Sequence, residues 1–248
     1  MNPSLENRVP RILLLYWVIK IAATTLGETG ADMFSMTFNL GYLRTTEIFL
    51  GLFLVLLAGK LMLKGYHPMA YWAVFTATAV AGTGISDFID RTLGLGYLIG
   101  SGILSALLLA VLAIWHRRER SISVENIKSP SVEIYYWAAF LIANTLGTAA
   151  GDFLADTVGL GFAQSAILIT TLLALIALAH YFTKISGLLL FWLAFVLTRP
   201  FGATFGDLLT KPLSHGGLNL GTMGASAFFA AVLVIAVMKE TRLERGRT

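Results

Sequence analysis

Four aspartates recur in one sequence context, each fifteen residues after a tryptophan: Asp32, Asp87, Asp152 and Asp207. Two further acids lie one helical turn away, Glu28 before Asp32 and Asp156 after Asp152. The chain has no cysteine, so a metal site here would use oxygen ligands, which hard divalent cations prefer. We therefore expect Glu28, Asp32, Asp152 and Asp156 to bind a divalent cation such as Mn²⁺, Mg²⁺ or Ca²⁺, and we expect no other cofactor.

Basic residues accompany two of the four aspartates. Arg91 follows Asp87 by four residues, and Lys211 follows Asp207 by four, a spacing that allows ion pairs along one helix face. The first and third aspartates have no base at this offset and are flanked by a second acid instead. The pattern predicts acid–base pairs at the second and fourth aspartates and an acid-rich site at the first and third aspartates.

Other polar residues interrupt the apolar stretches before these acids. Asn144 and Arg199 each lie seven residues after a tryptophan, and Lys20 lies three residues after one. We expect Lys20 to extend to the membrane interface and Arg199 to act as a counter-ion for the acids. The predicted ion path comprises Glu28, Asp32, Asp87, Asp152, Asp156, Asp207, Asn144 and Arg199. No catalytic residue is assigned, because no nucleophile–base set, His-Glu-x-x-His motif or nucleotide-binding loop occurs.

The composition indicates that the elements holding these residues lie in a membrane. Of 248 residues, 56% are hydrophobic and 13% are charged, whereas soluble proteins average about 25% charged residues. Apolar stretches such as 48–63, 98–115 and 225–238, with their uncharged flanks, reach the roughly 20 residues that a helix needs to cross a bilayer. Since these stretches are continuous rather than alternating, they favour helices over a β-barrel.

The tryptophans belong to a repeat that occurs four times. An aromatic–Trp pair, a glycine ten residues later, the aspartate, and then a Leu-Gly pair recur in register. The copies cover about 11–65, 66–120, 131–185 and 186–240, and the charged stretch 116–130 is the expected linker between two duplicated halves. The fourth copy carries an insertion between its aspartate and its Leu-Gly pair.

Each copy predicts two helices, a first helix with the Trp, Gly and Asp and a second that is almost wholly apolar. Small residues four positions apart let membrane helices approach closely, and they recur in the first helix of each copy at Gly27, Gly82, Gly147, Gly151, Gly202 and Gly206. We therefore expect a single all-α membrane domain over 1–248, with eight transmembrane helices as four parallel two-helix repeats. The first helices would be central and the second helices peripheral. The tryptophans are expected to anchor the helices at the membrane interface, at Trp17, Trp72, Trp137 and Trp192.

Charge asymmetry predicts the orientation. Most Lys and Arg lie at the termini and in the loops between copies, whereas the bends within copies carry Arg44, Arg91 and Lys211. The positive-inside rule then places both termini in the cytoplasm of a multi-pass inner (plasma) membrane protein. The expected partners are the lipid bilayer and a cation substrate, not nucleic acid, and a homo-oligomer is compatible with the pattern.

The four Trp–Gly–Asp registers, from Tyr16 to Met238, resemble those of a bacterial membrane-protein family of unknown function. Its members carry four tandem repeats, each with two transmembrane segments and a repeated tryptophan. The resemblance implies the eight-helix architecture and implies no activity.

The sequence favours a cation transporter or channel, most consistent with a divalent metal. One alternative is a Mg²⁺-dependent membrane enzyme acting on a lipid or diphosphate substrate, because Asp87-x-x-Asp90 resembles the diphosphate motifs of intramembrane prenyltransferases. Another is a non-transporting assembly protein, in which every acid would find an internal partner.

Overall fold

The computed structural model describes residues 7–122 and 127–246. Within them the chain is helical and contains no strand, as the predicted all-α class requires. The eight α-helices are α1 (Leu14–Asp32), α2 (Gly41–Met62), α3 (Pro68–Asp87), α4 (Gly96–Glu119), α5 (Pro130–Asp152), α6 (Gly161–Phe182), α7 (Gly187–Thr210) and α8 (Thr222–Arg245). Helix α4 continues to Glu119 and α5 begins at Pro130, and residues 123–126 of the expected linker lie outside the described residues.

Seven of these helices are long and apolar enough to cross a membrane. The exception is α1, which carries the charged residues Lys20, Glu28 and Asp32. All three side chains are buried inside the protein. The charges of α1 therefore do not face the surroundings of the bundle.

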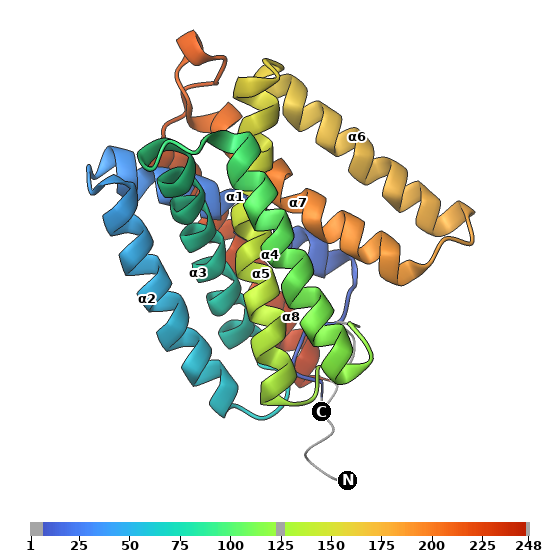
Figure 1. The fold of residues 1–248 in the computed structure, drawn as a ribbon. Coiled ribbons are helices and arrows are strands. Elements are labelled where there is room, and N and C mark those ends of the chain that lie inside the picture. The colour runs from blue at the N-terminus through green and yellow to red at the C-terminus, as the bar shows by residue number, and fades with distance from the viewer. Residues whose placement is uncertain (1–6, 123–126, 247–248) are drawn as a thin grey trace.

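The odd-numbered helices form a closed ring. Helix α1 packs against α3 and α7, and α5 packs against the same two helices. Each even-numbered helix packs mainly on the odd-numbered helix of the following repeat, α2 on α3, α4 on α5 and α6 on α7 (Figure 1). Helix α8 packs on α1, so the last repeat closes on the first.

Glycines allow the ring helices to approach closely. A Cβ atom added to Gly27 would lie 2.6 Å from the Cβ of Ala79 on α3, and one added to Gly82 would lie 2.9 Å from the Cβ of Asn144 on α5. The equivalent glycines on α5 and α7 lie against Arg199 and Thr24 in the same way. Each glycine thus faces the next odd-numbered helix in the ring.

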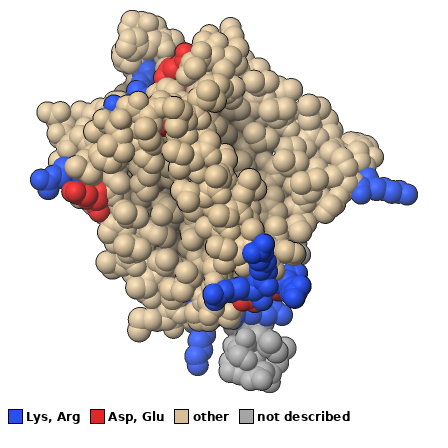
Figure 2. Space-filling view, viewed as in Figure 1, with Lys and Arg blue, Asp and Glu red and all other residues tan. Residues whose placement is uncertain are grey.

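The surface separates apolar sides from charged ends. Lys and Arg gather at the end where both termini lie, and the face between the ends is almost free of charged side chains (Figure 2). The exposed side chains of α2, α4 and α6 include the apolar residues Leu54, Val55, Leu109 and Ile167. Such a surface suits lipid rather than water.

The tryptophans do not all lie at the surface. Trp72 and Trp137 are 1% and 0% exposed, so these two are not interface anchors as the sequence suggested. Their indole N–H groups donate to Glu240 (2.6 Å) and Glu133 (3.3 Å) respectively. A buried indole needs such an acceptor, and the two glutamates lie outside the repeated pattern.

Candidate functional site

The repeated aspartates lie together at one end of the ring. Asp32, Asp87 and Asp152 are each the last residue of an α-helix, and each is followed by one π-helical turn (Met33–Thr37, Phe88–Thr92 and Phe153–Thr157). Asp207 lies in the last turn of α7, and an irregular loop follows it. All four side chains are buried. The repeat therefore delivers one carboxylate from each ring helix to the same end of the bundle.

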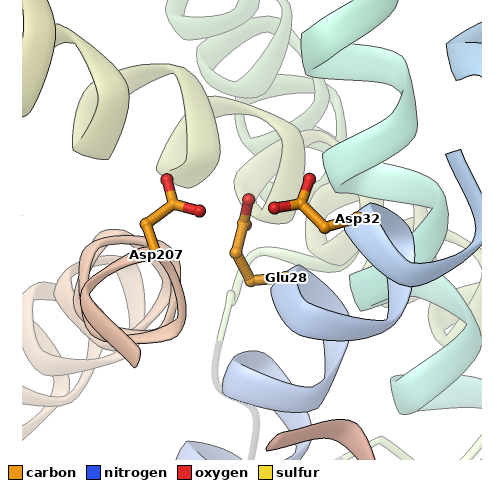
Figure 3. Close-up of side chains that lie close together, drawn as sticks. All are labelled: Glu28, Asp32 and Asp207. Carbon is orange, nitrogen blue, oxygen red and sulfur yellow. The ribbon is translucent and has the colours of Figure 1, made fainter. Parts of the chain in front are cut away.

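Lys211 joins the first and fourth aspartates. Its Nζ lies 2.6 Å from Asp32 Oδ2 and 3.3 Å from Asp207 Oδ1. Glu28 points toward the same space from the preceding turn of α1 (Figure 3). One oxygen from each of Glu28, Asp32 and Asp207 lies within 4.8 Å of the others. We call these four residues the Lys211 cluster.

Arg91 joins the second and third aspartates in a similar way. Its guanidinium lies 2.9 Å from Asp87 Oδ1 and 3.2 Å from Asp152 Oδ2. Asp156 lies at 4.0 Å and is 46% exposed, and it also accepts a hydrogen bond from the Tyr97 hydroxyl (3.3 Å). We call Asp87, Arg91, Asp152 and Asp156 the Arg91 cluster.

These contacts correct one sequence prediction. Asp32 and Asp152 were expected to lack a base, yet each pairs with the base of a neighbouring repeat. A spacing of four residues indicates an ion pair with a residue nearby in the sequence, and it gives no information about partners on another helix. The predicted cation ligands are also divided, because Asp152 and Asp156 lie around Arg91, whereas Asp207 joins Glu28 and Asp32.

Arg199 lies one layer deeper in the ring. Its side chain is 1% exposed, and its stem packs against Gly147, where an added Cβ would lie 2.4 Å from Arg199 Cγ. The guanidinium donates to oxygens on three other ring helices: Glu28 Oε2 (3.2 Å), Thr24 O (3.0 Å), Ala79 O (3.4 Å), Thr148 Oγ1 (2.7 Å) and the Thr83 hydroxyl. Arg199 thus links all four ring helices beneath the aspartates.

Lys20 lies deeper still and does not extend to the interface as predicted. It is fully buried and donates to Phe195 O (2.7 Å) and to the hydroxyl of Thr198. Its ammonium also lies 3.6 Å from the centre of the Phe195 ring. The lysine is held inside because a carbonyl, a hydroxyl and an aromatic face replace its water. Asn144 is likewise buried, and its amide donates to Thr78 Oγ1 (3.0 Å).

Aromatic side chains fill the ring beyond Lys20. The rings of Phe140 and Phe195 are 4.2 Å apart, and those of Phe75 and Phe140 are 5.6 Å apart. One layer further, the hydroxyls of Tyr71 and Tyr136 are 2.5 Å apart. The site is therefore built on the aspartate end of the ring, and the other end is packed with aromatic residues.

The carboxylates hold Lys211 in its charged form. Burial alone disfavours an ammonium, but Asp207 and Asp32 outweigh this effect and raise the pKa of Lys211 above its ordinary value. Chemically, the Lys211 cluster is a set of oxygen ligands around a positive charge. The ligand set suits a hard cation.

A family model described as Repeat of Unknown Function (DUF347) matches residues 15–66, 70–121, 135–186 and 190–245. The four matches coincide with the four predicted copies and confirm the tandem repeat. Searches of curated proteins and of solved structures find no match. Since the four segments cover most of the chain, the protein belongs to the family defined by the Repeat of Unknown Function (DUF347).

Proposed function

We propose that the chain crosses a membrane eight times, as four parallel two-helix repeats with the odd-numbered helices central and the even-numbered helices toward lipid. Helix α1 serves as the eighth crossing, since its 19 residues span about 28 Å at about 1.5 Å per residue. Its charged side chains are buried, so they do not oppose insertion.

The proposed orientation places both termini in the cytoplasm of the inner membrane and the aspartates toward the outside. Arg44, whose side chain is 75% exposed, lies at the start of α2, next to the aspartate end. A cysteine introduced at Arg44 would be the chain's only thiol. We expect an impermeant maleimide to label it in intact cells; labelling that needs inverted vesicles would reverse the orientation.

The proposed activity is binding and transport of a cation, with a divalent metal as the preferred class. The observation that carries the proposal is the ratio of acids to bases: Arg91, Arg199 and Lys211 pair with five buried carboxylates, namely Glu28, Asp32, Asp87, Asp152 and Asp207. Five carboxylates and three bases leave two negative charges uncompensated, and in a poorly solvated place these charges need protons or a cation. A divalent ion supplies that charge, and the Glu28, Asp32 and Asp207 oxygens provide ligands of the right type.

A carrier fits the ring better than an open channel does. Below the aspartates, the axis contains the guanidinium of Arg199, whose positive charge opposes the passage of a cation, and then the buried side chain of Lys20. The aromatic layers Phe75, Phe140 and Phe195 follow. A cation bound at the aspartates would therefore cross only if the ring helices rearrange.

One observation favours the alternative of a non-transporting assembly protein. Each of the five buried carboxylates contacts a base, as a purely structural network would require. The two alternatives differ in the response to added cations. A structural network is complete without them, whereas a transporter is stabilised by its substrate.

The decisive experiment measures Mn²⁺, Mg²⁺ and Ca²⁺ binding to purified protein by calorimetry and thermal unfolding, and uptake into proteoliposomes. We expect Asp32→Asn to abolish binding and uptake. Glu47→Gln is the matched control, because it removes an exposed carboxylate (56% exposed) near the start of α2. If the unmodified protein neither binds nor is stabilised by any of the three ions, the assembly role is correct.

A further inference from the structure

We infer that Lys211 is a tethered cation, which occupies the carboxylate triad of Glu28, Asp32 and Asp207 and leaves it when the substrate cation binds. This inference rests on the proposed function and adds to it a mode of regulation, in which substrate and side chain compete for the same oxygens. The relevant geometry is the close approach of one ammonium to two members of a three-carboxylate set (Figure 3).

The triad contains more ligand capacity than Lys211 uses. The ammonium donates a hydrogen bond to Asp32 Oδ2, but it meets Asp207 Oδ1 at 3.3 Å without forming a hydrogen bond. Asp207 Oδ1 is fully enclosed and has no other hydrogen-bond partner. A buried carboxylate oxygen that meets its base only as an ion pair, with no hydrogen bond, has ligand capacity left for a cation.

The backbone around Lys211 differs from that around Arg91. Arg91 lies on the π-helical turn Phe88–Thr92, whereas Lys211 is the first residue beyond α7 and begins the inserted loop. The loop is held through the Lys211 backbone, whose carbonyl accepts from Asn219 N (3.0 Å). An added Cβ on Gly217 would lie 2.0 Å from the same carbonyl, so a side chain there would displace the loop. The main chain is thus fixed while the lysine side chain has free rotatable bonds.

Lys211 also has a route out of the triad. Its side chain is 16% exposed, whereas the carboxylates of Asp32 and Asp207 are 3% and 2% exposed. A long, flexible lysine can move its charge toward solvent while its stem stays in place.

Substitution of Lys211 should therefore strengthen cation binding. With Mn²⁺ as the ligand, we expect Lys211→Cys to lower the dissociation constant at least about tenfold, the size of a typical coupling between two binding events. Arg44→Gln is the control for loss of a positive charge at the same end of the molecule, and it should change the constant less than about twofold because exposed charges are screened.

The absence of native cysteine allows the charge to be restored in the same protein sample. Aminoethyl methanethiosulfonate converts the cysteine at 211 into a lysine-like ammonium, and we expect it to return Mn²⁺ affinity to the starting value. A neutral reagent of similar size should leave the affinity high.

Three outcomes are informative. Tighter binding that only the charged reagent reverses supports the exchange. If Lys211→Cys leaves Mn²⁺ affinity unchanged or weakens it while Asp32→Asn still abolishes binding, the tethered-cation role is wrong and the proposed function stands. If neither the unmodified protein nor the Lys211 variant binds Mn²⁺, Mg²⁺ or Ca²⁺, both proposals fail together.

Discussion

The Lys211 and Arg91 clusters use the same scheme in the two halves of the ring. In each, a base four residues after an even-copy aspartate bridges that aspartate and one from a neighbouring odd copy. The clusters differ in their third carboxylate. The first repeat has the buried Glu28 where the third has Thr148, and the third repeat has the half-exposed Asp156 where the first has Met36. A duplicated pattern therefore supplies the ion pairs, and the Lys211 cluster becomes a candidate cation site because its third carboxylate, Glu28, is buried, unlike Asp156.

The bases differ as well. Arg91 contacts three carboxylates and lies 5.7 Å from the centre of the Tyr97 ring, so several groups fix its planar guanidinium. Lys211 contacts two carboxylates from an inserted loop. Under the proposal above, the Arg91 cluster would stabilise the ring, and the Lys211 cluster would exchange its cation.

The largest expected effect is the loss of stability when a ring glycine is replaced, and it tests whether the helices beside the Lys211 and Arg91 clusters are equally tightly packed. Gly82 lies at the seam beside the Arg91 cluster and Gly202 at the seam beside the Lys211 cluster, with added Cβ atoms 2.9 Å from Asn144 Cβ and 2.8 Å from Thr24 Cβ. Overpacking typically costs about 1–3 kcal/mol and more where backbone must move, so we expect Leu at either glycine to cost at least about 3 kcal/mol. Thermal and denaturant unfolding in detergent would measure it.

Exposed alanines on the even-numbered helices provide the controls. Ala174→Leu on α6 and Ala231→Leu on α8 place the same leucine side chain at exposed positions and should change stability little. If Leu at Gly82 and Leu at Gly202 lower the stability equally, the two regions share the same packing and differ in charge. Tolerance of Leu at one of the two glycines would show that the regions differ in packing as well.

The repeat made the helices predictable. Since every copy carries the same apolar pattern, the order of eight helices could be predicted from the chain. The pairs of Arg91 with Asp87 and of Lys211 with Asp207 followed from their spacing of four residues. The partner repeat could not be deduced, because contacts between helices distant in sequence depend on how the ring closes. Once α7 packs on α1, Lys211 reaches Asp32, 179 residues away.

Burial was the second feature that the sequence did not determine. Lys20 and Trp137 are of types that commonly lie at a membrane interface, and both are fully enclosed. Their partners, Phe195 O for Lys20 and Glu133 for Trp137, come from another repeat or from outside the repeated positions. A polar side chain is buried or exposed according to these partners, and residue type alone does not specify them.

The last prediction compares removal of each base. Arg91→Gln leaves Asp87 and Asp152 without their base, and loss of one partner of a buried pair costs about 3–5 kcal/mol, which we reduce to about 1–3 kcal/mol because Arg91 is 33% exposed. Asp87→Asn alone should cost less, since Arg91 keeps Asp152. Adding Asp87→Asn and Asp152→Asn to Arg91→Gln should recover most of the loss, because no buried carboxylate of the Arg91 cluster then remains unpaired, and the remaining Asp156 is 46% exposed. Lys211→Gln leaves Asp32 and Asp207 unpaired in the same way. Millimolar Mn²⁺ should restore the melting temperature of Lys211→Gln and should not restore the melting temperature of Arg91→Gln. The measurement is thermal unfolding of each variant with and without the metal. Recovery of both variants by Mn²⁺ would mean that the two clusters are equivalent cation sites and that Glu28 does not distinguish them.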